Sequence, residues 1–273
     1  MSLSSFFDAF SYAFMRNALI GGVLISVCAG LLGVSLVLKR FSMIGDGLSH
    51  VGFGALAIGA AAGIAPLKVA IPVVIIAAVL LLRINENSRL NGESAIALIS
   101  TASLAVGIVV ASFTGGMNID LNNYMFGSIL AMKKEYVTVC IILCAVIGIL
   151  YFMLYHRIFT TTFDETFAKA TGVKTDVYTS VIAVLTAVTI VLGMQMMGAL
   201  LMSSFVIFPA LTAMRICKSF KGTVLISCIE AVVSFVIGLF LSFTLNTPAG
   251  ATVVLVNLAV YIFVCFIGKL KRA

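Results

Sequence analysis

Long apolar runs recur along the whole chain and are separated by short polar segments. They occupy residues 18–38, 43–63, 67–83, 94–113, 137–155, 177–194, 196–214, 223–243 and 250–268. Each run holds about 20 residues, which is the length that an α-helix needs to cross a bilayer. Short segments of alternating polarity, typical of membrane β-barrels, do not occur. The pattern predicts an all-α polytopic membrane protein with about nine spans, or eight if 177–194 and 196–214 form one.

Composition and charge support this interpretation. The 273 residues are 62% hydrophobic and only 10% charged, whereas soluble domains carry about 25% charged residues. The net charge is +7, but thirteen of the 17 Lys and Arg residues fall on one side of the predicted spans and four on the other. Cytoplasmic loops are rich in Lys and Arg, so we expect the N-terminus outside and the C-terminus inside. The cations therefore indicate membrane topology and not a nucleic-acid partner.

We expect one transmembrane domain over residues 1–273. Residues 1–16 are polar and aromatic, which predicts a short helix at the membrane interface. Two connections are longer than the rest. Segment 115–134 is predicted outside and is too polar at its start to span the membrane, so we expect a short helix there. Segment 156–176 is predicted inside the cell.

The inner segment carries signals for a short helix of its own. Thr162 is a predicted N-cap with Glu165 three residues later, the spacing of a capping box. Gly172 is placed to end the helix as a C′ glycine. Phe163 and Phe167 fall on one face. An exposed aromatic face on the cytoplasmic side favours docking to a soluble partner, and the alternative is an amphipathic helix lying on the lipid surface.

Asp46 and His50 lie one helical turn apart in a stretch that is otherwise uncharged. An Asp in the middle of a span costs roughly 2.5–3.5 kcal/mol on insertion scales, so it indicates a function. A carboxylate and an imidazole on one helix face suit a divalent first-row metal. Two ligands are too few for a closed zinc site, although a symmetric dimer would supply four. The alternative is a hydrogen-bonded pair that only pins two helices together.

Three further residues are candidates for a transport pathway. Glu230 lies inside a span about two turns from its cytoplasmic end; it is placed either to reach toward Lys221 or Lys218, or to handle a metal or a proton. Asp120 lies at the outer surface, where it would receive a metal or simply be solvated. Pro209 should kink its span, and such kinks either line a pathway or only accommodate packing.

Other motifs that carry chemistry are scarce. All six cysteines fall within or at the ends of the apolar runs, and none forms a CxxC pair. Cys140 and Cys144 share a helix face and are a possible metal pair, although buried cysteines usually behave as small hydrophobes. The chain has no GxxxxGK[ST], HExxH or GxSxG motif. We therefore expect no enzyme activity, and energy for transport would come from a partner or an ion gradient.

Five stretches in order carry a resemblance to a known family. They are LGVSLVLKRFSMIGDGLSHVGFGALAIG (32–59), IDLNNYMFGSILA (119–131), FDETFAKATGV (163–173), MGALLMSSFVIFPALTAMRI (197–216) and TPAGATVVL (247–255). With these, the chain resembles the membrane permease of bacterial zinc and manganese ABC importers, nearly end to end. The resemblance implies a homodimeric or pseudo-dimeric permease in the plasma membrane, two cytoplasmic ATPase subunits and an external metal-binding protein.

The resemblance also implies roles for single residues. Asp46 and His50 match the family's GD-x-L-x-H pattern and would handle the metal in transit. The stretch from Asp164 to Gly172 would be the coupling helix held by the ATPase, with Asp164, Glu165, Phe167, Ala168 and Gly172 as its candidate residues. The family has no permanently bound cofactor, and its cargo is Zn²⁺ or Mn²⁺. We favour zinc, because stretches 124–131 and 247–255 look closer to the zinc branch and imidazole-containing sites bind zinc more tightly than manganese.

Two other function classes compete with the ABC importer. One is a secondary metal–proton transporter, in which Asp46, His50 and Glu230 would form a proton relay and no ATPase would be needed. The other is an intramembrane enzyme, which no nucleophile–base pair supports. The helix predicted in 156–176 favours the importer, because a secondary carrier has no need of a docking helix.

Overall fold

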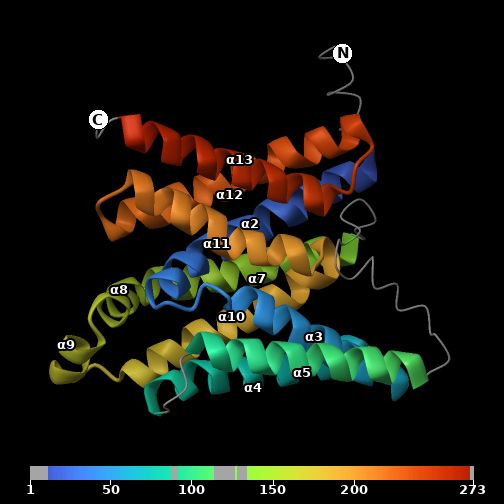
Figure 1. Ribbon diagram of the computed structural model, residues 1–273, viewed down its shortest axis with the longest axis horizontal. Helices are drawn as coiled ribbons and strands as arrows, with labels where there is room; N and C mark the ends of the chain where they lie inside the picture. Colours follow the sequence, from blue (N-terminus) through green and yellow to red (C-terminus); the bar gives the residue numbers. More distant parts are fainter. Residues whose placement is uncertain (1–11, 88–91, 114–126, 128–133, 271–273) are drawn as a thin grey trace.

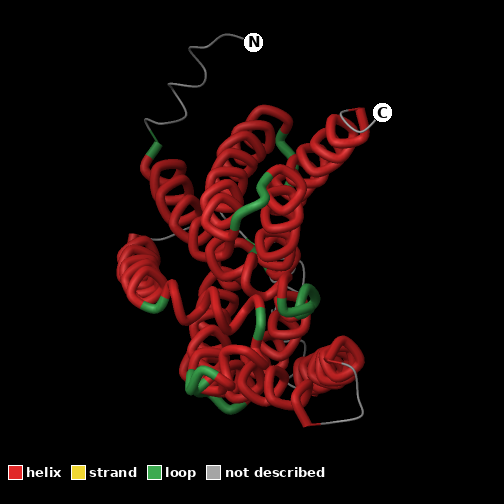
Figure 2. The backbone as a smooth tube through the Cα atoms, turned by 90° about the vertical axis from the view of Figure 1, so that its left-hand side faces the viewer, coloured by secondary structure: helices red, strands yellow, loops and turns green. Residues whose placement is uncertain are grey.

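A computed structural model describes residues 12–87, 92–113, 127 and 134–270, and every regular element in them is an α-helix. The helices are α2 (Ala13–Leu38), α3 (Ile44–Ala61), α4 (Pro66–Asn87), α5 (Gly92–Phe113), α7 (Lys134–Met153), α8 (Tyr155–Phe163), α9 (Glu165–Ala170), α10 (Thr175–Met197), α11 (Ala199–Ile216), α12 (Phe220–Leu245) and α13 (Ala249–Leu270). Figures 1 and 2 show the long helices running side by side. The prediction of an all-α polytopic fold is confirmed.

Each of the nine predicted runs lies largely within a different long helix. Within the described residues, seven helices are long and apolar enough to cross a membrane, and α7 with α8 makes an eighth if this pair, bent by 71°, is one span. The ninth long helix, α3, lies outside that set and carries five glycines together with Asp46 and His50. The runs 177–194 and 196–214 are separate helices, α10 and α11, because Gly198 between them takes φ 91° and ends α10.

The helices form two groups that meet in the middle of the molecule. In Figure 1, α12 and α13 lie along the top edge with α2 and α11 beneath them, while α4 and α5 lie along the bottom edge with α3 and α10 above them. The best buried spans are α2 and α10, and the least buried are α5 and α13 at the two edges. The two groups join where α11 packs on α10 and α3.

Glycines allow α3 to be packed from several sides. A Cβ on Gly54 would lie 2.6 Å from the carbonyl oxygen of Ser103 on α5, and one on Gly52 would lie 2.7 Å from the side chain of Met194 on α10. Side chains at these positions would hold the neighbouring helices away. The glycines therefore allow α3, which carries Asp46 and His50, to pack closely against its neighbours in the interior of the bundle.

The predicted helix in 156–176 exists, but its start was placed wrongly. Thr162 is not an N-cap: it is buried within α8. The cap of α9 is Asp164, which has an extended backbone and whose Oδ1 accepts a hydrogen bond of 2.8 Å from the backbone N–H of Phe167. An Asp caps a helix at least as well as a Thr, so the capping-box spacing was outweighed by the residue two positions later.

The predicted end of this helix is confirmed. Gly172 takes φ 80°, and its N–H donates to the carbonyl oxygen of Lys169. The N–H of Val173 donates to the carbonyl oxygen of Ala168 at 3.0 Å. These two bonds make a Schellman motif, which needs a residue in the left-handed conformation at C′ and so favours glycine.

Two sequence predictions fall largely outside the described residues. Of the predicted interfacial segment 1–16, residues 13–16 belong to the first turn of α2, and residues 1–11 are not described. Of segment 115–134, with its predicted short helix and Asp120, the structure describes Gly127 and Lys134 alone.

Candidate metal site

The predicted pair of metal ligands lies in the first two turns of α3. His50 Nε2 is 3.6 Å from Asp46 Oδ2, so the two side chains share a helix face as their spacing predicts. The side chain of Asp46 is 43% exposed and that of His50 is 20% exposed. The pair is therefore accessible and not sealed within the chain.

A third polar group reaches the pair from α11. The hydroxyl of Ser203 is 3.4 Å from Asp46 Oδ1 and 3.1 Å from the backbone carbonyl oxygen of Ala199, so its single O–H is shared between these two acceptors. The two helices meet at Gly45, where a Cβ would lie 3.4 Å from the Cα of Ser203, an ordinary van der Waals contact. Sequence reasoning missed Ser203. A serine within a span usually bonds to its own helix, so nothing in the pattern singles it out.

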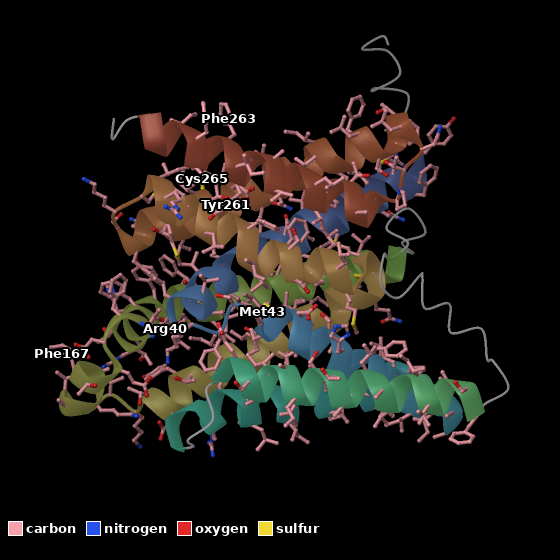
Figure 3. The ribbon with its side chains drawn as sticks, viewed as in Figure 1. Arg40, Met43, Phe167, Tyr261, Phe263 and Cys265 are labelled. Atoms are coloured by element: carbon pink, nitrogen blue, oxygen red, sulfur yellow. The ribbon has the colours of Figure 1, made fainter. Side chains whose placement is uncertain are left out.

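The face of α3 that carries the pair is open over the first two turns of the helix, and residues 51–57 beyond it are buried. Met43, one turn before Asp46, is 47% exposed, and residues 43, 46 and 50 follow one another at helical spacing. Figure 3 shows Met43 within the length of the bundle and away from its two ends. In the described part of the chain, no group of three or more His, Cys, Asp or Glu side chains gathers into a metal site. One chain therefore offers two ligands on an open face.

Glu230 is buried in α12, and the prediction that it reaches toward Lys218 or Lys221 is wrong. Its side chain is 8% exposed and its Oε1 accepts a hydrogen bond of 2.9 Å from Ser234, one turn further into the helix. Its Oε2 has no hydrogen-bond partner among the described residues. Because α12 packs on α2, α11 and α13, Glu230 forms no cluster with the acid–imidazole pair of α3.

The remaining candidates contribute less. Pro209 is buried in α11, which continues as one helix from Ala199 to Ile216. Asp120 lies outside the described residues. Cys140 is buried with its Sγ 3.3 Å from Met196 Sδ, and neither it nor Cys144 joins a cluster of ligands among the residues described.

The sequence as a whole matches one family. The profile of the ABC 3 transport family aligns with residues 11–268. The chain belongs to the ABC 3 transport family. It is accordingly a multi-pass plasma-membrane permease of the ABC type for import of manganese, zinc or iron, and ATP hydrolysis belongs to a separate subunit in such systems.

Individual members of the ABC 3 transport family agree over nearly the whole chain. A probable metal transport system membrane protein of Thermotoga maritima is 30% identical over 98% of this chain and 93% of its own. The manganese import system permease protein ScaB of Streptococcus gordonii is 29% identical over 96% of this chain and 94% of its own. The high-affinity zinc uptake system membrane protein ZnuB of Haemophilus influenzae is 28% identical over 93% of this chain and 97% of its own.

A solved structure confirms the ABC permease fold. The structure of PsaBC from Streptococcus pneumoniae in complex with a Fab superposes with a TM-score of 0.86 and 28% identity. The match covers 96% of this chain and 95% of the other. The arrangement of the ABC 3 permease helices described above is therefore shared with an experimentally determined relative.

Proposed function

We propose that this chain conducts a divalent transition metal into the cell and that Asp46 and His50 bind the metal in transit. The observation that carries the proposal is their placement 3.6 Å apart on an open face of a helix within the bundle. The hydroxyl of Ser203 helps to orient the carboxylate. A site with two protein ligands binds an ion weakly enough to release it, which transport requires.

We infer that two copies of the chain complete the site. Zinc in a closed site takes four ligands, and two copies related by a two-fold axis beside α3 would supply two carboxylates and two imidazoles. The open stripe of Met43, Asp46 and His50 supports this arrangement, because an exposed ligand pair on a membrane helix would otherwise face lipid.

We favour zinc over manganese as the cargo. An imidazole ligand suits zinc, and nitrogen-containing sites bind zinc more tightly than manganese. The relatives include a manganese permease and a zinc permease. Selectivity also depends on geometry and metal availability, so direct flux measurements decide between the two ions.

We propose α9 as the contact for a cytoplasmic ATPase subunit, while an external binding protein delivers the metal. Phe163 and Phe167, on either side of the Asp164 cap, are 61% and 59% exposed, and exposed aromatic side chains of this size are typical of protein contacts. Figure 3 shows Phe167 at one end of the bundle, pointing outward. Ala168 is buried and Gly172 ends the helix, so these two residues help to set the orientation of α9 on the bundle.

A partly buried lysine links α9 to the turn that leads to the metal site. Lys39, which ends α2, has its Nζ 3.5 Å from Glu165 Oε2 and donates to Thr179 Oγ1 at 2.9 Å. The next residue, Arg40, takes φ 64°, and α3 begins four residues after it. A displacement of α9 therefore acts on the turn between α2 and α3, which supports ATP-driven control of the metal ligands.

The test is metal flux into vesicles that hold the permease, its ATPase and its binding protein. His50→Ala and Asp46→Asn should each lower ATP-dependent zinc flux by at least 10-fold, since each removes one of two ligands. His156→Ala is the matched control, because this exposed histidine on α8 is the other histidine of the chain. Unchanged flux in His50→Ala would remove the pair from the pathway.

The same assay separates the importer from a secondary metal–proton transporter. The relay that such a carrier needs would have to include Glu230, which bonds to Ser234 and lies apart from Asp46 and His50. We therefore expect no flux without the ATPase and little effect of a protonophore. Flux that persists without ATP and collapses with the proton gradient would favour the carrier.

A further inference from the structure

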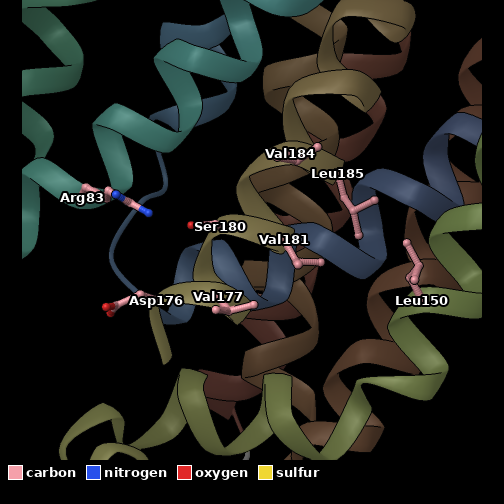
Figure 4. A pocket seen from close by; sticks show the side chains of 8 residues that line it. All are labelled: Arg83, Leu150, Asp176, Val177, Ser180, Val181, Val184 and Leu185. Carbon is pink, nitrogen blue, oxygen red and sulfur yellow. The ribbon is translucent and has the colours of Figure 1, made fainter. Parts of the chain in front are cut away.

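A groove with no assigned function lies between α4, α7 and α10, apart from the metal ligands. Its volume is about 470 Å³, which is within the range of roughly 300–1,000 Å³ seen for ligand sites. Figure 4 shows the side chains that line it. The groove exists because α10 packs along α4 while α7 packs on α2, so that α10 and α7 touch over a short length.

The body of the groove is apolar. Its lining includes Val177, Val181 and Val184 on one stripe of α10, with Leu185 beside them and Leu150 across the gap on α7. Val177 is 53% exposed. In a multi-pass membrane protein, an open apolar groove on a spanning helix suits a hydrocarbon chain, because lipid tails are the apolar molecules around it.

One end of the groove is polar and charged. Arg83 from α4 and Asp176 from the first turn of α10 lie there, with the hydroxyl of Ser180 between them and the valines (Figure 4). Among the described residues, Arg83 and Asp176 form no ion pair with each other or with any other side chain. The Asp176 carboxylate accepts a hydrogen bond from Thr175 at 3.4 Å. A cation and an anion therefore lie at the same end of the groove, each able to bind a group of opposite charge.

We propose that this groove binds one membrane phospholipid with a zwitterionic, amine-bearing headgroup, of the phosphatidylethanolamine class. Its phosphate would lie against Arg83, its ammonium against Asp176, and an acyl chain along Val177, Val181 and Leu150. Charge-assisted hydrogen bonds to a phosphate and from an ammonium are the strongest contacts that these two side chains offer. An apolar groove with one charge of each sign at its mouth matches that headgroup better than it matches an anionic one.

The surroundings of the groove make Asp176 the residue that selects the headgroup. A neighbouring cavity of about 280 Å³, which shares Val177, is lined by the cations Arg157 and Lys174. Clusters of cations at the ends of membrane helices attract anionic lipids. Removal of the Asp176 carboxylate would leave cations alone at this end, so the preference should move from zwitterionic to anionic lipid.

The experiment is native mass spectrometry of the full-length chain in detergent, titrated with phosphatidylethanolamine and with phosphatidylglycerol. The wild type should retain phosphatidylethanolamine preferentially. Asp176→Asn should lower that retention about 5-fold or more and raise retention of phosphatidylglycerol, the size expected for one lost charge-assisted bond. Arg83→Gln should weaken both lipids, and Val181→Phe, which fills the groove, should abolish both.

Arg215→Gln is the control, because it removes an exposed cation at the end of α11, outside the groove. Thermal unfolding of every variant reports whether it is folded. If the wild type prefers phosphatidylglycerol, the proposed headgroup is wrong. If the Arg83→Gln and Val181→Phe variants bind both lipids as well as the wild type does, the groove is not a lipid site. Neither result touches the roles of Asp46 and His50, which are read from metal flux.

Discussion

Asp46 receives its hydrogen bond from a residue 157 positions later in the chain, so the geometry of the metal ligands depends on how α3 packs against α11. The spacing of Asp46 and His50 is a local property of one helix and is predictable from sequence. The contribution of Ser203 is not, because it depends on which helix lies beside α3. Local periodicity places side chains on a face, whereas packing decides what that face meets.

Ser203→Ala should weaken metal binding in transit without abolishing it. The variant removes a donor from Asp46, and a neutral hydrogen bond to a charged group contributes about 1.5–3 kcal/mol at most in a buried setting. Because Asp46 is partly exposed and the contact is 3.4 Å long, we expect a rise of about 3-fold in the KM for zinc flux, with an unchanged maximal rate.

The matched control for that measurement is Ser112→Ala. The hydroxyl of Ser112 is exposed and donates to the carbonyl oxygen of Ile108 on its own helix, α5. It should leave KM unchanged. If the KM of Ser203→Ala equalled that of the control, the contact of Ser203 with Asp46 would make no contribution to transport.

At the scale of elements, the helices follow the apolar runs closely, while the short helix α9 shows where sequence signals compete. Thr162 with Glu165 has the spacing of a capping box, yet Asp164 caps the helix and α8 extends to Phe163. Thr162 is buried within α8, and Asp caps a helix at least as well as Thr, so α9 begins after Asp164.

Asp164→Ala should uncouple ATP hydrolysis from transport. Loss of the N-cap costs a helix about 1 kcal/mol, and α9 has six residues with which to compensate. We expect binding of the ATPase subunit to weaken and flux to fall severalfold, while metal binding to the permease stays unchanged. Asp164→Asn should retain flux, because Asn caps as well as Asp. Equal loss in both variants would assign the effect to the charge and not to the cap.

At the scale of the whole molecule, the sequence predicts the number of long helices but not their neighbours. The sequence-based count treats α3 as a span like the others, although it carries Asp46 and His50 and lies outside the set of helices apolar enough to cross a membrane. The packing of α3 explains how a helix with these polar residues lies within the bundle. Its glycines let it pack between α4, α5, α10 and α11, so protein surrounds most of it. Which helices meet at those glycines depends on the packing of the entire bundle, and no local pattern carries that information.

Gly54→Ala should therefore destabilise the bundle, whereas Gly148→Ala should not. A Cβ at Gly54 would lie 2.6 Å from the backbone oxygen of Ser103, and Gly107 on the facing helix packs against Gly54 in turn. Moving two helix backbones apart costs about 1–3 kcal/mol. A Cβ at Gly148 on α7 meets nothing within 4 Å, and Ala is the better helix former by about 1 kcal/mol. Thermal unfolding in detergent should show a lower Tm for Gly54→Ala and an equal or higher Tm for Gly148→Ala. If the two variants melted at the same temperature, the close approach of α3 and α5 at Gly54 would not contribute to the stability of the bundle.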